Sequence, residues 1–137
     1  MQHTTLAPYL NFDGDCREAM ETYRDVLGGE LMIQTFAEAG MSKDEATGER
    51  IVHAMLKSEH LTLLACDTMP DMKLIKGNNV HLSLAGSDEQ SLTDIFQKLS
   101  HGGAVDMPLG KQFWGDTFGM LTDKHGIHWM VNISAAA

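Results

Sequence analysis

The chain has 137 residues, of which 43% are hydrophobic and 21% are charged, a composition typical of a soluble globular protein with one domain. Its formal net charge is −9 and its basic residues form no run, which argues against nucleic acid and anionic membranes as partners. No apolar stretch approaches the roughly 20 residues of a membrane span, and the N-terminus lacks the features of a secretory signal. We therefore expect a cytoplasmic protein with reduced thiols at Cys16 and Cys66.

The first half of the chain predicts a strand, a helix and three further strands. The first strand shows alternating apolar residues, namely Leu6, Pro8, Leu10 and Phe12. Residues 16–27 carry apolar side chains at helical spacing, with Asp15 as a candidate N-cap and Gly28 and Gly29 as a stop. Strands are predicted at about 30–37, 51–58 and 61–67. The polar segment from Ala39 to Arg50 is predicted to be a mobile loop.

The same order of elements follows in the second half. Residues 68–79 show no periodicity and are predicted to be a linker. A strand is predicted at 80–86 and a helix up to Ser100, with Ser87 or Asp88 as its cap and Gly102 and Gly103 as its stop. Strands are expected at about 104–110, 118–123 and 128–134.

The recurrence of this order predicts two βαβββ modules within one domain, residues 1–137. A shift of 72 positions places Leu10 on Leu82 and Leu27 on Leu99, so the helix stripes coincide as well. The modules span about 4–67 and about 80–134. Chance recurrence of α+β elements is the alternative, and the matching helix stripes favour the repeat. Two such modules predict an α+β fold with a curved mixed sheet around a concave pocket.

Strand alternation predicts which side chains line the concave side. In the middle and last strands, the expected core residues are Val52, Ala54, Leu56, Trp129, Val131 and Ile133. The residues expected to face inward are Tyr9, Asn11, His53, Met55, His81, Ser83, Ala85, His128, Met130 and Asn132. This mixture of polar and apolar groups suits a small-molecule pocket.

Three stretches carry a resemblance to a known family. They are PYLNFDGDCREAMETY with LGGEL, then IVHAML, then FWGDTFGMLTDKHGIHWMV at residues 113–131. With them, nearly the whole chain resembles the PhnB-like branch of the glyoxalase/bleomycin-resistance superfamily, also called vicinal oxygen chelate (VOC) proteins. The resemblance implies two βαβββ modules side by side and a homodimer. It does not define the chemistry, because one fold hosts many activities.

Residues 113–131 are interpreted mainly as turns and strands. Gly115, Gly119 and Gly126 are expected where the turns require glycine, and Asp116 is expected to cap its own turn. Trp129 is a predicted core residue. Trp114 is either structural or a lid over the pocket.

The resemblance also implies a divalent metal site with one ligand from each of four strands. His53 and His81 match two of these positions. Met130 stands where a carboxylate is usual, and Tyr9 or Ala7 stands at the fourth position, so the set is incomplete. His128 is a candidate third ligand. Either the two histidines hold zinc, nickel, manganese or iron, or they are neutral, hydrogen-bonded pocket residues.

The cysteines offer little further chemistry. Cys66 lies in an apolar run and is expected to be an inert core thiol, whereas Cys16 at a helix start is a candidate for a depressed pKa.

Three functions are compatible with these residues. The first is a small-molecule-binding protein with a pocket that includes Tyr9, His53, His81, Trp114 and His128. The second is a metal-dependent lyase, isomerase or dioxygenase in which His53 and His81 hold the ion. The third is antibiotic sequestration, which 7% aromatic residues support poorly. Relatives in this branch have been named demethylubiquinone methyltransferases, but no glycine-rich nucleotide turn is present and S-adenosylmethionine is not expected to bind.

Overall fold

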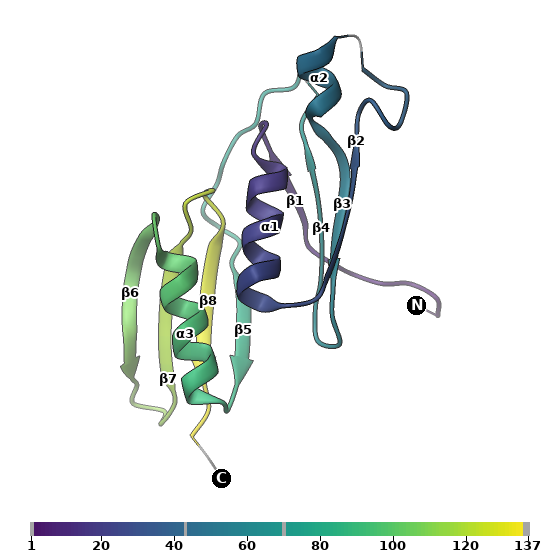
Figure 1. Cartoon of the computed structure of the whole chain (residues 1–137). Helices are drawn as coiled ribbons and strands as arrows, with labels where there is room; N and C mark the ends of the chain where they lie inside the picture. Colours follow the sequence, from purple (N-terminus) through teal and green to yellow (C-terminus); the bar gives the residue numbers. More distant parts are fainter. Residues whose placement is uncertain (1, 43, 70, 136–137) are drawn as a thin grey trace. The chain divides into compact units, whose positions relative to one another are not determined.

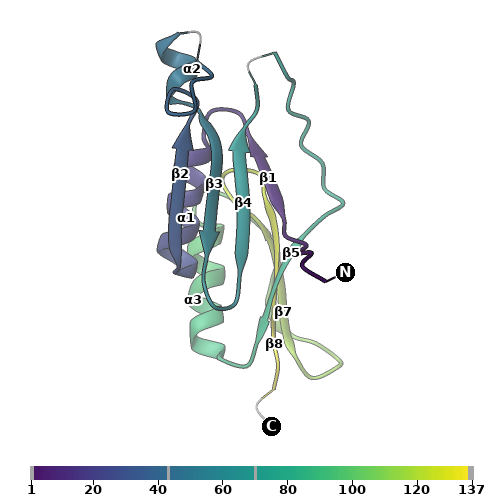
Figure 2. The ribbon, with the colours of Figure 1, turned by 90° about the vertical axis from the view of Figure 1, so that its right-hand side faces the viewer.

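The computed structural model describes residues 2–42, 44–69 and 71–135, and the chain divides into two compact units, Met1–Ile75 and Lys76–Ala137. In each unit a long helix covers one face of a four-stranded sheet (Figures 1 and 2). The fold is α+β with two modules, as predicted, and it is built from two separate open sheets.

The first unit contains a sheet with the strand order β1-β4-β3-β2. β1 runs parallel to β4, whereas β3 is antiparallel to both β4 and β2. This pairing places residues 9–12 beside 64–67, which are far away in the sequence. The elements are β1 (Tyr9–Phe12), α1 (Cys16–Leu27), β2 (Glu30–Thr35), α2 (Glu45–Glu49), β3 (Ile51–Lys57) and β4 (Thr62–Asp67).

Helix α1 begins and ends where its sequence pattern predicts. Its apolar stripe is buried against the sheet and includes Ala19, Met20 and Tyr23. Gly28 follows the helix with a φ of 80°, a conformation that favours glycine. Asp15 occupies the N-cap position, but its side chain makes no capping hydrogen bond. The predicted cap is therefore correct in place and wrong in chemistry.

Two predictions about the segment before β3 and about β3 itself are wrong. Residues 39–50 do not form only a loop, because they contain the short helix α2, whose N-cap Asp44 accepts a hydrogen bond from the Thr47 N–H at 2.7 Å. At the start of β3, a register shift against β2 turns Ile51 into the core at 1% exposure. Val52, which alternation placed in the core, is only half-buried.

The second unit repeats this topology with the strand order β5-β8-β7-β6, and β5 runs parallel to β8. Asp88 caps α3 by accepting a hydrogen bond from the Ser91 N–H at 3.1 Å. Trp129 and Leu121 lie in the core with Phe96 of the helix. The elements are β5 (Leu82–Gly86), α3 (Glu89–Ser100), β6 (Ala104–Lys111), β7 (Thr117–Thr122) and β8 (His128–Ile133).

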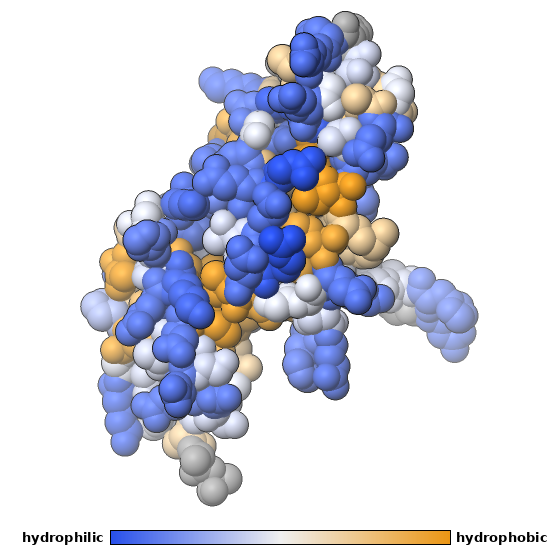
Figure 3. Space-filling model, viewed as in Figure 1, coloured by the Kyte–Doolittle hydropathy of each residue, from blue (hydrophilic) through white to orange (hydrophobic). Residues whose placement is uncertain are grey.

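Leu10 and Leu82 hold corresponding places, each in the first strand of its unit and paired in parallel with the last strand. The outward faces of α1 and α3 carry mostly hydrophilic residues (Figure 3). Among the described residues, none of the helices has the length and apolar character needed to cross a membrane.

Candidate functional site

The face of the first sheet opposite α1 collects the polar residues that alternation predicted. Tyr9 and Leu64 are direct neighbours across the β1–β4 pair, and Leu64 is also paired with Met55 of β3. Asn11 and His53 are exposed on the same side of their strands. We call this surface the open face of the first unit.

Tyr9 and His53 form the polar centre of this face. The Tyr9 hydroxyl lies 3.4 Å from His53 Nδ1, and the ring centroids are 6.1 Å apart. Partial desolvation, followed by the neighbouring Cys66 thiol, raises the pKa of Tyr9 to about 12. The phenol therefore keeps its proton at neutral pH and can donate it in a hydrogen bond to the imidazole or to a ligand oxygen.

The structure contradicts the sequence prediction for both cysteines. Cys66 is only half-buried, and its thiol donates a hydrogen bond to Asn11 Oδ1 at 3.4 Å on the open face. Cys16 is fully buried. Burial, and then the nearby Asp67 carboxylate, raise the pKa of the Cys16 thiol instead of lowering it.

Asp67 organises this end of the first unit, although the sequence offered no signal for it. Its carboxylate is 3% exposed and accepts hydrogen bonds from the backbone N–H groups of Gly14, Cys16 and Ile51 at 2.7, 3.1 and 2.9 Å. One side chain thus joins the β1–α1 turn, the start of α1 and the start of β3.

The second unit has an open face of its own, opposite α3. Ser83 of β5 pairs with Met130 of β8, and Met130 pairs with Met120 of β7. His128 lies on the same side of β8. The His81 ring stands beside the His128 ring with centroids 5.3 Å apart. These are the residues that alternation predicted for the second module.

His128 is held from both sides of its ring. Its Nε2 lies 2.9 Å from the carbonyl oxygen of Gly77, and its Nδ1 lies 2.9 Å from the Thr122 hydroxyl. The residue lines a small pocket of about 470 Å³ together with Lys76 and Asn78. Both nitrogens of His128 are thus engaged within the second unit, and its role as a third metal ligand stays a prediction.

The turn between β6 and β7 presents aromatic rings to solvent. Trp114 is 49% exposed and Phe113 is 97% exposed, with ring centroids 5.0 Å apart in an edge-to-face arrangement. Asp116 does not cap its own turn through its side chain. It accepts hydrogen bonds from Asn132 Nδ2 at 3.0 Å and from the Ala135 N–H at 3.4 Å, which anchors the turn to β8.

The three glycines of residues 113–131 have two different roles. Gly115 and Gly126 have φ values of 99° and 88°, as turn glycines require. Gly119 lies inside β7, where an added Cβ would come within 2.9 Å of the Phe96 ring. It is therefore needed for close helix–strand packing, and its assignment to a turn was wrong.

The donor groups of either unit do not fit a resident divalent ion. Within the described parts of the chain, no three His, Cys, Asp or Glu side chains are grouped to hold a metal. His53 Nδ1 faces the Tyr9 hydroxyl, His128 is engaged at both nitrogens, and Met130 offers only a thioether. The predicted convergence of His53 and His81, which belong to different units, stays a prediction.

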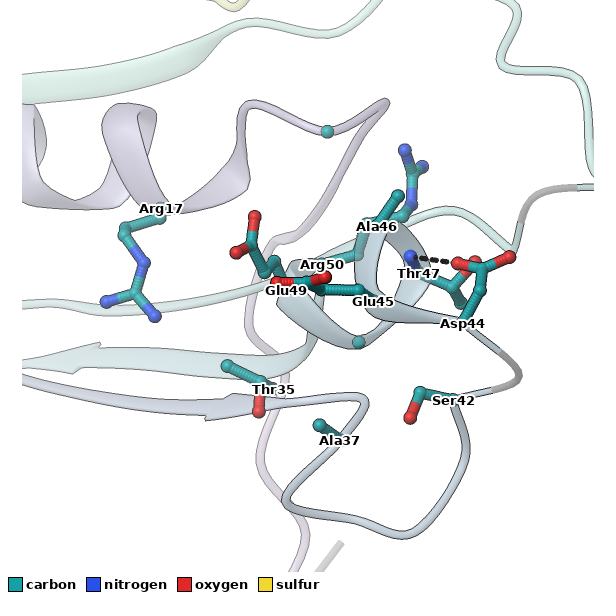
Figure 4. Close-up of a pocket in the computed structure, with 12 residues that line it drawn as sticks. Arg17, Thr35, Ala37, Ser42, Asp44, Glu45, Ala46, Thr47, Glu49 and Arg50 are labelled. Carbon is teal, nitrogen blue, oxygen red and sulfur yellow. Dashed lines mark hydrogen bonds between the residues drawn. The ribbon is translucent and has the colours of Figure 1, made fainter.

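A larger pocket in the first unit escaped the sequence analysis. It has a volume of about 1130 Å³ and is lined by Arg17 of α1, Thr35 of β2, and α2 with its flanking residues (Figure 4). The sequence analysis missed this pocket because it did not predict α2, whose polar segment resembles a loop in sequence. The one local signal was Asp44, a residue type that commonly caps the N-terminus of a helix, as it does for α2.

Two βαβββ units, each with an open sheet face of mixed polarity, define a protein of the vicinal oxygen chelate type. Residues 3–131 match the Glyoxalase/Bleomycin resistance protein/Dioxygenase superfamily, and the chain belongs to that superfamily.

Its relatives place it in the PhnB-like branch. It is similar in structure to protein PA1353 from Pseudomonas aeruginosa, with 36% identity, a TM-score of 0.86, and coverage of 97% of this chain and 99% of that one. A PhnB protein from Bacillus cereus, with a proposed 3-demethylubiquinone-9 3-methyltransferase activity, has 25% identity and a TM-score of 0.80, with 96% and 100% coverage. Protein YjdN from Escherichia coli is 29% identical over 93% of this chain and 94% of its own length.

Proposed function

We propose that this chain binds a small molecule on its open sheet faces and that Tyr9 and His53 recognise an oxygen atom of the ligand. The main observation that supports this proposal is the Tyr9–His53 pair. A protonated phenol and an imidazole stand 3.4 Å apart on a surface to which Met55 and Leu64 add apolar side chains. A site with a few polar groups among apolar side chains is typical of small-molecule recognition, because apolar contacts hold the ligand and the polar groups orient it.

The donor sets described above favour this function over a metal-dependent lyase, isomerase or dioxygenase. In the second unit, His81, Ser83, Met130 and the exposed Trp114 are the proposed ligand contacts. We also propose that the protein acts in the cytoplasm as a homodimer, with no nucleic acid or membrane partner. Light scattering at micromolar concentration tests the dimer, and a monomer there would contradict it.

Amide NMR tests ligand binding with a panel of small oxygenated compounds: hydroxyketones, carboxylic acids, phenols and quinones. A ligand should shift the amide signals of Tyr9, His53 and Met55 in a saturable way. Tyr9→Phe should weaken that binding by about tenfold, the loss of one ligand hydrogen bond. The control is Glu59→Gln at an exposed turn, with the side chain 88% exposed. Binding that shifts other signals only, or that is equal in Tyr9→Phe, would contradict the proposal.

A further inference from the structure

The pocket beside α2 lies at a different place from the open face of its unit. Arg17 at the start of α1 forms one wall, and Glu45 and Glu49 of α2 form another. In Figure 4 both glutamate side chains extend from α2 toward the side of the pocket on which Arg17 lies. A volume of about 1130 Å³ leaves ample room for a small molecule between these charges.

The wall that carries the glutamates is held in place before any ligand arrives. The Phe36 N–H donates to the Arg50 carbonyl oxygen at 2.9 Å, and the Ala37 N–H donates to the Gly48 carbonyl oxygen at 3.1 Å. Phe36 is 1% exposed and anchors the segment in the core. Gly48 is buried, and a Cβ there would lie 3.2 Å from the Ala37 side chain. These contacts fix α2 against the end of β2 and so pre-organise the wall.

The charges on the pocket separate into engaged and unengaged groups. Asp44 caps α2, and the Arg50 guanidinium donates to the Asp13 carboxylate and to the Thr68 carbonyl oxygen, both within 2.9 Å. By contrast, Arg17, Glu45 and Glu49 take part in none of the ion pairs or side-chain hydrogen bonds found in the described residues. The unengaged groups therefore carry charges of both signs on opposite walls.

Glu45 and Glu49 are also a like-charge pair four residues apart on one helix face, an arrangement that destabilises a helix. Glu49 lies in the last turn, where the helix dipole disfavours a negative charge, and the guanidinium of the C-cap residue Arg50 is engaged by Asp13 and Thr68. A bound cation between the two carboxylates would relieve the repulsion between them. The pair of like charges therefore favours a positively charged group in the pocket.

We propose that this pocket binds a zwitterionic small molecule, with an ammonium group between Glu45 and Glu49 and an acid group on the Arg17 guanidinium. A planar guanidinium forms two parallel hydrogen bonds with a carboxylate, and an ammonium group donates to two carboxylates at once. Amino acids with separated ends are the simplest ligands of this class. This site is additional to the ligand on the open faces.

Titration calorimetry at low salt tests the site with glycine, 4-aminobutyrate and 6-aminohexanoate, each beside the amine and the acid of the same chain length. At least one amino acid should bind about tenfold more tightly than both of its single-charge analogues, because it uses both walls. Glu49→Gln and Arg17→Gln should each reduce its affinity by about fivefold or more, and added salt should weaken it further. The matched control is Arg24→Gln on the same helix, whose partner is Asp25.

Binding of the amine alone as tightly as the amino acid would overturn the proposal, because Arg17 would then contribute nothing. The absence of binding by all three amino acids in the wild-type protein would overturn it too. So would equal affinities in Glu49→Gln and the wild type, once circular dichroism shows that the variant is folded. Tyr9→Phe should leave this binding unchanged, which separates the site from the open face.

Discussion

Asp67→Asn probes the carboxylate that joins three segments of the first unit. The substitution keeps the shape but leaves one oxygen for the Gly14 and Cys16 N–H groups and turns an NH₂ toward the Ile51 N–H. The opposite amide orientation is worse, because it sets a donor against two donors. One hydrogen bond to a charged group is worth about 1.5–3 kcal/mol, and the two retained bonds weaken when the charge is lost. We expect a loss of about 2–4 kcal/mol, a large part of a typical stability of about 5–15 kcal/mol.

Urea unfolding followed by far-ultraviolet circular dichroism measures the global loss, and hydrogen exchange at the Gly14, Cys16 and Ile51 amides measures the local one. The control is Asp25→Asn on α1, whose carboxylate is 70% exposed in a surface ion pair and should contribute less than about 1 kcal/mol. If Asp67→Asn is as mild as Asp25→Asn, the reasoning from charge-assisted hydrogen bonds is refuted.

Three further predictions test separate parts of the structure. Gly103→Ala should lower the free energy of unfolding in urea by about 2 kcal/mol or more, because the added Cβ would lie 2.2 Å from the Thr122 carbonyl oxygen. Gly110→Ala is the control and should cost far less, because no atom lies nearer than 3.8 Å to its Cβ. Ellman's reagent should react with Cys66 in the native protein and with Cys16 only after unfolding. Because burial raises the pKa of Cys16, the stability of the protein should fall as pH rises past about 8.5, the thiol pKa of the unfolded chain. This fall should be smaller in Cys16→Ala. Tyr9 should ionise near its pKa of about 12 in ultraviolet titration of Tyr23→Phe. Cys66→Ala should lower that pKa only in part, because desolvation by burial is the larger cause of its rise.

Sequence patterns predicted those parts of the fold that depend on local periodicity. The bounds of α1 follow from its apolar stripe and the glycines after it, and alternation placed Tyr9 and His53 on one face because β1 and β3 are regular over most of their length. The errors occur where a distant contact overrides the local pattern. The register shift between β2 and β3 turns Ile51 into the core in place of Val52. The sequence of neither strand predicts this shift.

The two cysteines illustrate the same limit. An apolar run around Cys66 indicated a core thiol, but β4 has one covered and one open face, and Cys66 lies on the open one. A helix start indicated a reactive Cys16, but the Asp67 carboxylate binds the Cys16 backbone N–H from another strand, and the thiol side is buried. Both outcomes depend on contacts with residues that are distant in the sequence, so the local pattern around each cysteine could not predict them. The pocket beside α2 was missed for the same reason, since contacts of Phe36 and Gly48 hold that helix.

The metal question separates the two leading functions, and Met130→Glu addresses it directly. The substitution adds a carboxylate to the open face of β8, beside Ser83. With His53 and His81 it would complete the three protein ligands that a zinc site generally uses, provided that the two faces converge as the family resemblance implies. After dialysis against zinc, elemental analysis should then find more metal in Met130→Glu than in the wild type, and His53→Ala in that background should abolish the gain. Loss of the gain with His81→Ala alone would instead place the ion within the second unit. A wild-type protein that already retains one ion per chain would contradict the donor-set argument and favour the metal-dependent enzyme.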